Sequence, residues 1–192
     1  MGDHVSNVVK VGYFHLRQLR IIRKYLTVQA TKTLVHATIV SRLDYANALL
    51  YGIPEKQLER LQRLQNHAAR LITNDSSSVH SKDILKRLHW LPVRARIQYK
   101  ILLLTFKSLN GLAPSYLRDL LTIQVPQRST RLSANGVRLV VPRSKLRFGG
   151  DRAFSITAPR LWNELPSDLR STCTLNQYKR GLKTFLFSNC FM

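Results

Sequence analysis

The residues best suited to chemistry in this sequence are cations that gather toward its C-terminal end. Eight arginines and lysines lie between residues 128 and 160, where Asp151 is the one acidic side chain: Arg128, Arg131, Arg138, Arg143, Lys145, Arg147, Arg152 and Arg160. Guanidinium and ammonium groups bind phosphate oxygens, and neutralising phosphates releases condensed counterions. Because this density exceeds what solubility requires, the segment is predicted to contact nucleic-acid phosphates.

Two smaller sets of cations recur at helical spacing. The first is Arg17, Arg20 and Lys24, and the second is Arg60, Arg63 and Arg70. Residues three, four or seven apart share one face of a helix, so each set forms a basic stripe. Such a stripe suits phosphate tracking, but it is also what an ordinary solvated helix face looks like, and both readings stay open for each stripe.

Acidic and nucleophilic residues show no pattern that predicts catalysis. The seven aspartates are scattered: Asp3, Asp44, Asp75, Asp83, Asp119, Asp151 and Asp168. Phosphoryl transfer by two metal ions needs carboxylates held close together, and the sequence also lacks the glycine-rich and histidine motifs of other enzymes. We therefore expect no catalytic residue, no metal ligand, no cofactor and no small-molecule substrate.

The whole chain is strongly basic. Its 192 residues carry 31 Lys plus Arg against 10 Asp plus Glu, for a formal net charge of +21. Hydrophobic residues make up 44%, which is enough for a folded core and excludes a disordered basic tail. A folded domain of this charge is predicted to bind a polyanion.

The elements that must position these cations are mostly helices. In the first part we expect a helix through Leu16 and Leu26, a second from Thr27 toward Leu50, and a third that begins at Pro54. A short helix over 82–88 and a long one over 93–109 follow, the latter ended by Asn110-Gly111. Pro114 is expected to start another short helix that ends near residue 121.

The part after residue 121 has a different character. A strand is predicted over Val137–Val141 and a second extended piece over Ala153–Thr157, before helices over 159–165 and 175–187. The predicted fold class is therefore mainly α, a helical bundle, with a small α+β basic C-terminal part. The predicted domains are residues 1–121 and 122–192, and the second carries 12 basic and 3 acidic side chains.

The two tryptophans allow two interpretations. Trp90 and Trp162 could stack on nucleic-acid bases, but each lies among leucines and prolines in the sequence. Tryptophan in such a context usually buries a large apolar surface. We therefore predict that both are core residues, together with Tyr99 and Phe106 on the long helix.

Several ordered motifs together resemble one known family. The clearest is the stretch from Leu88 to Leu117, LHWLPVRARIQYKILLLTFKSLNGLAPSYL. Other matching segments are Phe14–Arg17, Ser41–Leu50, Leu61–Arg70, Val140–Arg143, Phe148–Phe154, Ala158–Pro166 and Phe185–Phe187. Over most of its length the chain resembles the region that follows the polymerase palm in LINE-type (non-LTR) retrotransposon reverse transcriptases, of the jockey and chicken-repeat kind. The resemblance implies helices of the polymerase thumb and a C-terminal segment.

The resemblance does not imply polymerase activity. The family's catalytic Tyr-x-Asp-Asp motif and its other palm carboxylates do not occur in these 192 residues, nor does the endonuclease domain of complete elements. Asp44 falls in a matched thumb segment, and a lone carboxylate cannot hold two metal ions, so we interpret it as structural. The chain is predicted not to be an enzyme.

The predicted function is therefore phosphate-directed binding of RNA, DNA or RNA–DNA duplex by a non-catalytic fragment. One alternative is a translated relic of a degenerate element with no selected function. A second is a basic membrane-associated protein, which rests on the short N-myristoylation pattern at Gly2. We expect a nuclear or cytoplasmic location, and self-association through apolar residues of a truncated thumb: Val8, Val9, Val11 and Phe14.

Overall fold

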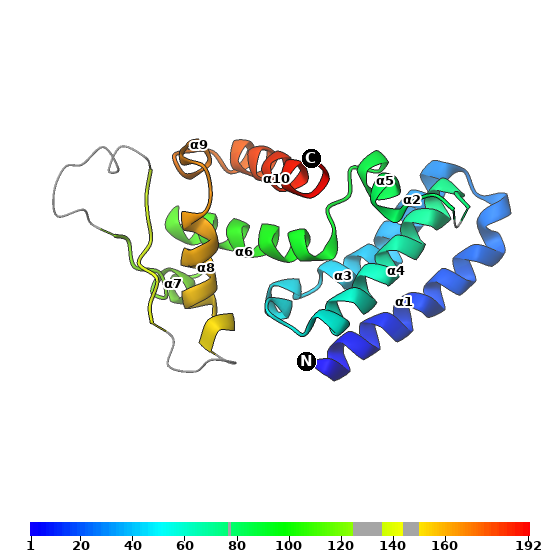
Figure 1. The fold of residues 1–192 in the computed structure, drawn as a ribbon, viewed down its shortest axis with the longest axis horizontal. Coiled ribbons are helices and arrows are strands. Elements are labelled where there is room, and N and C mark those ends of the chain that lie inside the picture. The colour runs from blue at the N-terminus through cyan, green and yellow to red at the C-terminus, as the bar shows by residue number, and fades with distance from the viewer. Residues whose placement is uncertain (77, 125–135, 144–149) are drawn as a thin grey trace. The chain divides into compact units, whose positions relative to one another are not determined.

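The computed structural model describes residues 1–76, 78–124, 136–143 and 150–192, and over them the chain is mainly helical (Figure 1). The predicted mainly α class is confirmed. The small β part is not seen: the described residues contain no strand, only an isolated antiparallel bridge between Ile123 and Leu139. None of the described helices is both long enough and apolar enough to cross a membrane.

The chain forms two compact units. The first comprises Met1–Ile97 and Phe187–Met192, and the second comprises Gln98–Leu186. These units are defined by how the chain packs, whereas the predicted boundary between residues 121 and 122 was based on charge and composition. That boundary stays a prediction.

The first unit is built from helices and short helical turns. Its elements are α1 (Gly2–Ile22), η1 (Arg23–Tyr25), α2 (Val28–Val35), η2 (His36–Val40), α3 (Ser41–Asp44), η3 (Asn47–Leu50), α4 (Glu55–Thr73), α5 (Ser81–Arg87) and the start of α6 (Val93–Leu109). Helices α1 and α4 run side by side in Figure 1. Their apolar side chains recur every three or four residues and form the core between them.

A glycine allows the close approach of α1 to α4. A Cβ atom added at Gly12 would lie 2.4 Å from Cδ2 of Leu64, which is closer than atoms can pack. Leu64 is completely buried, and Leu16, one turn after Gly12, is 1% exposed. A side chain at this position would therefore force Leu64 to shift within the packed core.

The predicted second helix, from Thr27 to Leu50, is interrupted. Thr27 does cap it as expected, because its Oγ1 accepts a hydrogen bond from the backbone N–H of Ala30 at 3.2 Å. The chain then passes through a π-helical turn and α3, and Ala46 adopts the left-handed conformation with φ of 50° before η3. The prediction of one continuous helix is wrong because Ala46 breaks it. Leu26, expected on the first helix, lies beyond the end of α1 in extended conformation.

The second unit contains the rest of α6, then α7 (Ser115–Arg118), η4 (Gly150–Arg152), α8 (Phe154–Asn163), α9 (Ser167–Arg170) and α10 (Leu175–Phe191) up to Leu186. Its core contains a cluster of aromatic rings. Phe106 stacks on Tyr178 with ring centroids 4.2 Å apart, and Trp162 lies 5.9 Å from the same tyrosine. The Tyr178 hydroxyl, completely buried, donates to the carbonyl oxygen of Leu102 at 3.3 Å.

Helix α6 matches its predicted bounds, and Gly111 follows it with φ of 69°, as expected of a helix stop. The prediction of an extended piece over Ala153–Thr157 is wrong, because Ala153 is the N-cap of α8 and the next four residues form the first turn of that helix, which contains Pro159 in its interior. Ile156, Ala158, Leu161 and Trp162 are all buried. Burial at helical spacing thus overrides the local preference of Phe, Ile and Thr for strands.

Candidate nucleic-acid interface

Ion pairs neutralise only part of the positive charge. Five arginines pair with carboxylates among the described residues: Arg63 with Glu59, Arg87 with Asp75, Arg94 with Glu55, Arg96 with Asp44, and Arg160 with Asp151. Ten acids face 31 cations in the sequence, so most cations have no carboxylate of their own. The excess charge is available for an external anion.

The predicted basic C-terminal segment is described in part. Arg128, Arg131, Lys145 and Arg147 lie outside the described residues, while Arg138 and Arg143 are described and exposed. Two side chains of α8 hold the backbone around Arg138. Asn163 accepts from the N–H of Leu139 at 3.0 Å and donates to its carbonyl at 2.7 Å, and the Trp162 indole donates to the carbonyl of Val137 at 2.9 Å.

This anchoring gives Arg138 a fixed backbone. Leu139 is 1% exposed and packs into the core. Successive side chains of an extended chain point to opposite sides, so Arg138 faces solvent. An exposed cation on a backbone held by three side-chain hydrogen bonds loses less entropy on binding than one on a loose loop. Arg138 is thus suited to contact a phosphate.

The remaining two cations of the predicted segment are less open. Arg160 forms an ion pair with Asp151 at 3.7 Å, and both side chains are roughly half exposed. Arg152 closes the turn η4, is half-buried and interacts with other residues. Their part in nucleic-acid binding stays a prediction.

Arg170 is a buried cation that the sequence did not single out. It is 7% exposed, its Nε donates to the carbonyl of Leu165 at 3.0 Å, and its Nη1 has no partner among the described residues. Burial and the charge of Arg138 lower its pKa. Residues 125–135 and 144–149, which are not described, contain no acid. Arg170 therefore adds to the positive charge near Arg138, and no ion pair between described residues offsets it.

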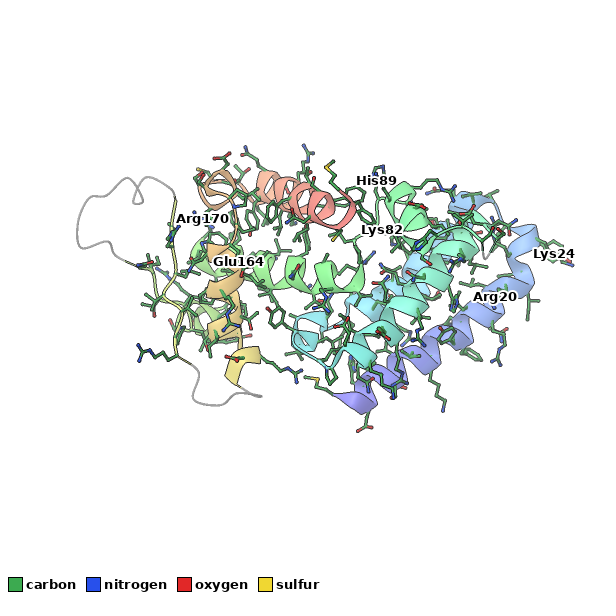
Figure 2. The ribbon with its side chains drawn as sticks, in the orientation of Figure 1. Arg20, Lys24, Lys82, His89, Glu164 and Arg170 are labelled. Atoms are coloured by element: carbon green, nitrogen blue, oxygen red, sulfur yellow. The ribbon has the colours of Figure 1, made fainter. Side chains whose placement is uncertain are left out.

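The α1 stripe is exposed as expected for a binding face. Arg17, Arg20 and Lys24 are all exposed, and none takes part in an ion pair between described residues. Figure 2 shows Lys24 just beyond the end of α1, pointing away from the other helices of its unit. The Lys24 ammonium lies 4.9 Å from the ring centroid of Tyr25. These three cations are presented to solvent.

The α4 stripe is largely used inside the protein. Arg60 donates to Ser6 Oγ at 3.1 Å and to Gln57 Oε1 at 2.9 Å, and is half-buried. Arg70, also half-buried, donates to the carbonyl of Val79 at 3.0 Å. Arg63 is exposed but carries its own carboxylate partner, Glu59. Two of the three arginines therefore hold helices and loops together, which spacing alone could not reveal.

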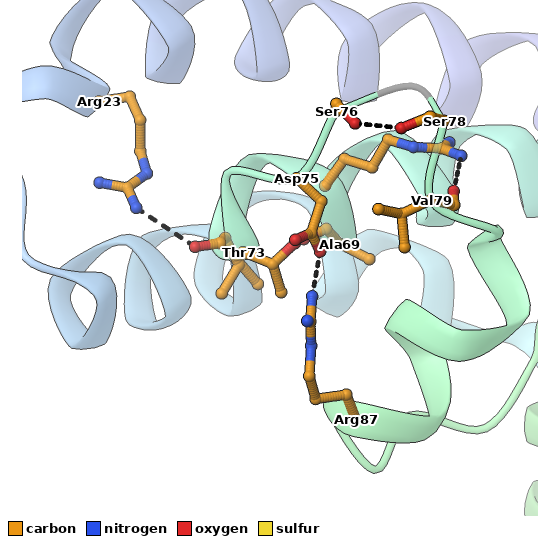
Figure 3. Close-up of polar contacts among 10 residues, drawn as sticks. Arg23, Ala69, Thr73, Asp75, Ser76, Ser78, Val79 and Arg87 are labelled. Atoms are coloured by element: carbon orange, nitrogen blue, oxygen red, sulfur yellow. Dashed lines mark hydrogen bonds and ion pairs between the residues drawn. The ribbon is translucent and has the colours of Figure 1, made fainter.

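Arg23, which was not predicted to matter, closes the C-terminal end of α4. Its Nε donates to the carbonyl of Leu71 at 2.9 Å, its Nη2 to that of Ile72 at 3.3 Å, and its Nη1 to that of Leu26 at 2.9 Å. Figure 3 shows one of these contacts, a dashed line from its guanidinium to a carbonyl oxygen at this end of the helix. A cation there satisfies free carbonyls and interacts favourably with the helix dipole.

The loop that follows α4 is stabilised in a similar way. Arg87 of α5 forms an ion pair with Asp75, visible in Figure 3. Asn74 ends α4 in the left-handed conformation with φ of 56°. Together with the Arg23 contacts, these interactions stabilise the end of α4.

Both tryptophans are core residues, as predicted. Trp90 is 4% exposed and Trp162 is 2% exposed, so neither offers a ring face to a base. Phe106 is also buried, as predicted, but Tyr99 is only half-buried, so the prediction that it is a core residue is wrong. The guanidinium of Arg96 lies 5.6 Å from the Trp90 ring centroid.

Asp44 has a structural environment. Both of its carboxylate oxygens accept from Arg96 Nη1, at 2.9 and 3.1 Å, and Asn47 lies at 3.5 Å. The part of the chain that the structure describes holds no group of three or more histidine, cysteine, aspartate or glutamate residues that could bind a metal ion. The interpretation of Asp44 as structural fits these contacts.

No protein-family model, curated protein or solved structure matches the chain. The sequence motifs, the charge and the geometry of the chain's own residues are therefore the basis for assigning a function.

Proposed function

We propose that this chain is a non-catalytic nucleic-acid-binding fragment of a LINE-type reverse transcriptase, the part that follows the palm. The relation to that family rests on the ordered motifs, above all Leu88 to Leu117. The binding function rests on one observation: a folded, mainly helical chain carries a net charge of +21, and exposed arginines without carboxylate partners account for part of it.

Two surfaces are the proposed contact sites. One is the exposed stripe of Arg17, Arg20 and Lys24, and the other holds Arg138 and Arg143. Contacts from arginine and lysine to phosphates fix position but read no bases. The proposed binding is thus indifferent to sequence and weakens steeply with salt, because counterion release drives it.

The test compares two double variants that lose the same charge. Arg138→Gln/Arg143→Gln removes two exposed cations, neither of which takes part in an ion pair between described residues. Arg87→Gln/Arg94→Gln removes two cations that already pair with Asp75 and Glu55, with side chains 57% and 61% exposed. Thermal melting verifies that both variants stay folded, and affinity for RNA, DNA and RNA–DNA duplexes is measured by fluorescence anisotropy across a salt series.

The Arg138/Arg143 variant is expected to reduce the slope of log affinity against log salt by about 1.8, since each phosphate contact on a duplex contributes about 0.9. The Arg87/Arg94 variant is expected to leave the slope nearly unchanged. Equal losses in both variants would mean that only net charge matters, and binding no tighter than that of a generic polycation would favour the relic interpretation.

A further inference from the structure

The solvent side of α1 carries cations and apolar side chains in alternation. Lys10, Phe14, Arg17, Ile21 and Lys24 follow one another at steps of three or four residues, so they form one row along the helix, continued into η1. We call them the α1 outer row. All five are exposed, with Phe14 at 56% and Ile21 at 64%. Tyr25, beside the last cation, is 77% exposed.

This row lies opposite the buried side of α1. Val5, Leu16 and Leu19 form the core contact of the helix, and positions 10, 14 and 17 are rotated away from them by roughly half a turn. Large apolar side chains at the outermost positions of a helix gain little from the fold, and several of them gathered beside polar residues mark an interaction site. Exposure of Phe14 was predicted; Val8, in contrast, is 9% exposed and belongs to the core.

The alternation decides which partner fits. In a membrane-bound helix the apolar residues share the centre of one face and lysines flank it, because cations must reach the headgroups. Here Lys10 and Arg17 lie on the same row as Phe14 and Ile21. A second copy of the chain would bring three more cations to the row, and like charges repel. A partner must therefore offer anionic and apolar groups in alternation.

We propose that the α1 outer row and Tyr25 bind unpaired nucleotides of single-stranded nucleic acid. In a single strand, phosphates alternate with base faces that are open to contact, whereas in a duplex the bases are stacked on one another and paired inside. Phosphates of the strand meet Lys10, Arg17 and Lys24, and bases stack on the rings of Phe14 and Tyr25. This inference rests on the proposed function and adds to it a preference for unpaired strands at this face.

The test uses the full chain and one RNA sequence in two forms, an unstructured labelled 20-mer and the same strand in a perfect duplex. The variant Phe14→Ala/Tyr25→Ala removes both rings and leaves every cation in place. The control Tyr45→Ala removes a tyrosine that is 72% exposed but lies outside α1. All are exposed side chains, and thermal melting verifies that each variant stays folded.

The double variant is expected to bind the single strand at least tenfold more weakly, since stacking on an aromatic side chain contributes a factor of about five or more per base. Its affinity for the duplex is expected to change less than twofold, and the Tyr45 control is expected to match the wild type. The variant Lys10→Gln/Arg17→Gln/Lys24→Gln removes three cations. It is expected to reduce the slope of log affinity against log salt for the single strand by about 2, since each phosphate contact contributes about 0.7.

Other results would overturn the inference in distinguishable ways. Equal loss on both RNA forms, or none on either, refutes stacking at this face but leaves the proposed function standing. Wild-type binding to neither RNA form refutes this inference, and the proposed function falls as well if the chain also fails to bind DNA and RNA–DNA duplexes. Two outcomes would assign the row to another partner, provided that Phe14→Ala/Tyr25→Ala leaves RNA binding unchanged. If this variant abolishes a dimer seen by sedimentation, the row binds a second copy of the chain. If it abolishes flotation with phosphatidylserine vesicles, the row binds a membrane.

Discussion

Arg17 lies in the last turns of α1 and Arg23 directly follows that helix. Their contacts nevertheless predict different effects of substitution: loss of stability at Arg23 and loss of a phosphate contact at Arg17. The Arg23 guanidinium donates to three backbone carbonyls, two of them at the C-terminal end of α4. Arg17 is exposed and takes part in no ion pair between described residues. Substituting each by methionine keeps most of the aliphatic stem and removes the charge and the donors.

The expected cost of Arg23→Met follows from its contacts. Hydrogen bonds from a charged donor are worth about 1.5 to 3 kcal/mol each when shielded, but the side chain is half-buried and water takes over part of the loss. The favourable charge at a helix C-terminus adds about 0.3 to 1 kcal/mol. We expect a loss of about 2 kcal/mol in the free energy of unfolding, or about 4 to 8 °C in Tm for a chain of this length.

Urea unfolding followed by circular dichroism measures the change in stability, and RNA binding across a salt series measures the change in phosphate contact. Arg23→Met is expected to lower the unfolding midpoint and to keep the salt slope. Arg17→Met is expected to stay within about 0.5 kcal/mol of wild-type stability. It is expected to reduce the slope of log affinity against log salt by the contribution of about one phosphate contact. If Arg17→Met destabilises the chain as much as Arg23→Met, the separation of structural from binding arginines is wrong.

Three further predictions concern stability and are checked by urea unfolding. Gly12→Val is expected to cost about 2 kcal/mol, because its side chain would overlap Leu64; a neutral result would contradict the close approach. Tyr178→Phe is expected to cost about 1 to 2 kcal/mol, since it leaves the buried carbonyl of Leu102 without its donor. Burial and nearby arginines lower the pKa of His67 below 6.5. The unfolded chain therefore binds this proton more readily, and stability is expected to fall as the pH drops below 6.5, less so in His67→Gln.

Local signals in the sequence predicted much of the helical scaffold. The bounds of α6 follow from its apolar spacing and from Gly111, whose left-handed conformation ends a helix. Thr27 caps α2 because its side chain is a good acceptor next to a helical pattern. The two tryptophans were assigned to the core from their apolar neighbours, and both are buried. These features depend on residues close together in the sequence.

Features that depend on distant residues were not predictable in the same way. Residues 153–157 look like a strand locally, and burial of their apolar side chains against the rest of the unit makes them part of a helix. Arg60 and Arg70 look like phosphate ligands by spacing, but their partners lie on other elements. Lys10 completes the α1 outer row, and the signal that marks it is the recurrence of cations seven residues apart at 10, 17 and 24.

The most direct test of phosphate-directed binding is the salt dependence of the wild-type affinity for an RNA–DNA duplex. Five exposed cations on the two proposed surfaces, each meeting one phosphate, predict a slope of log affinity against log salt of about −4 to −5. The five are Arg17, Arg20, Lys24, Arg138 and Arg143. A slope near zero, or an affinity equal to that of a random polycation of the same charge, would contradict the account.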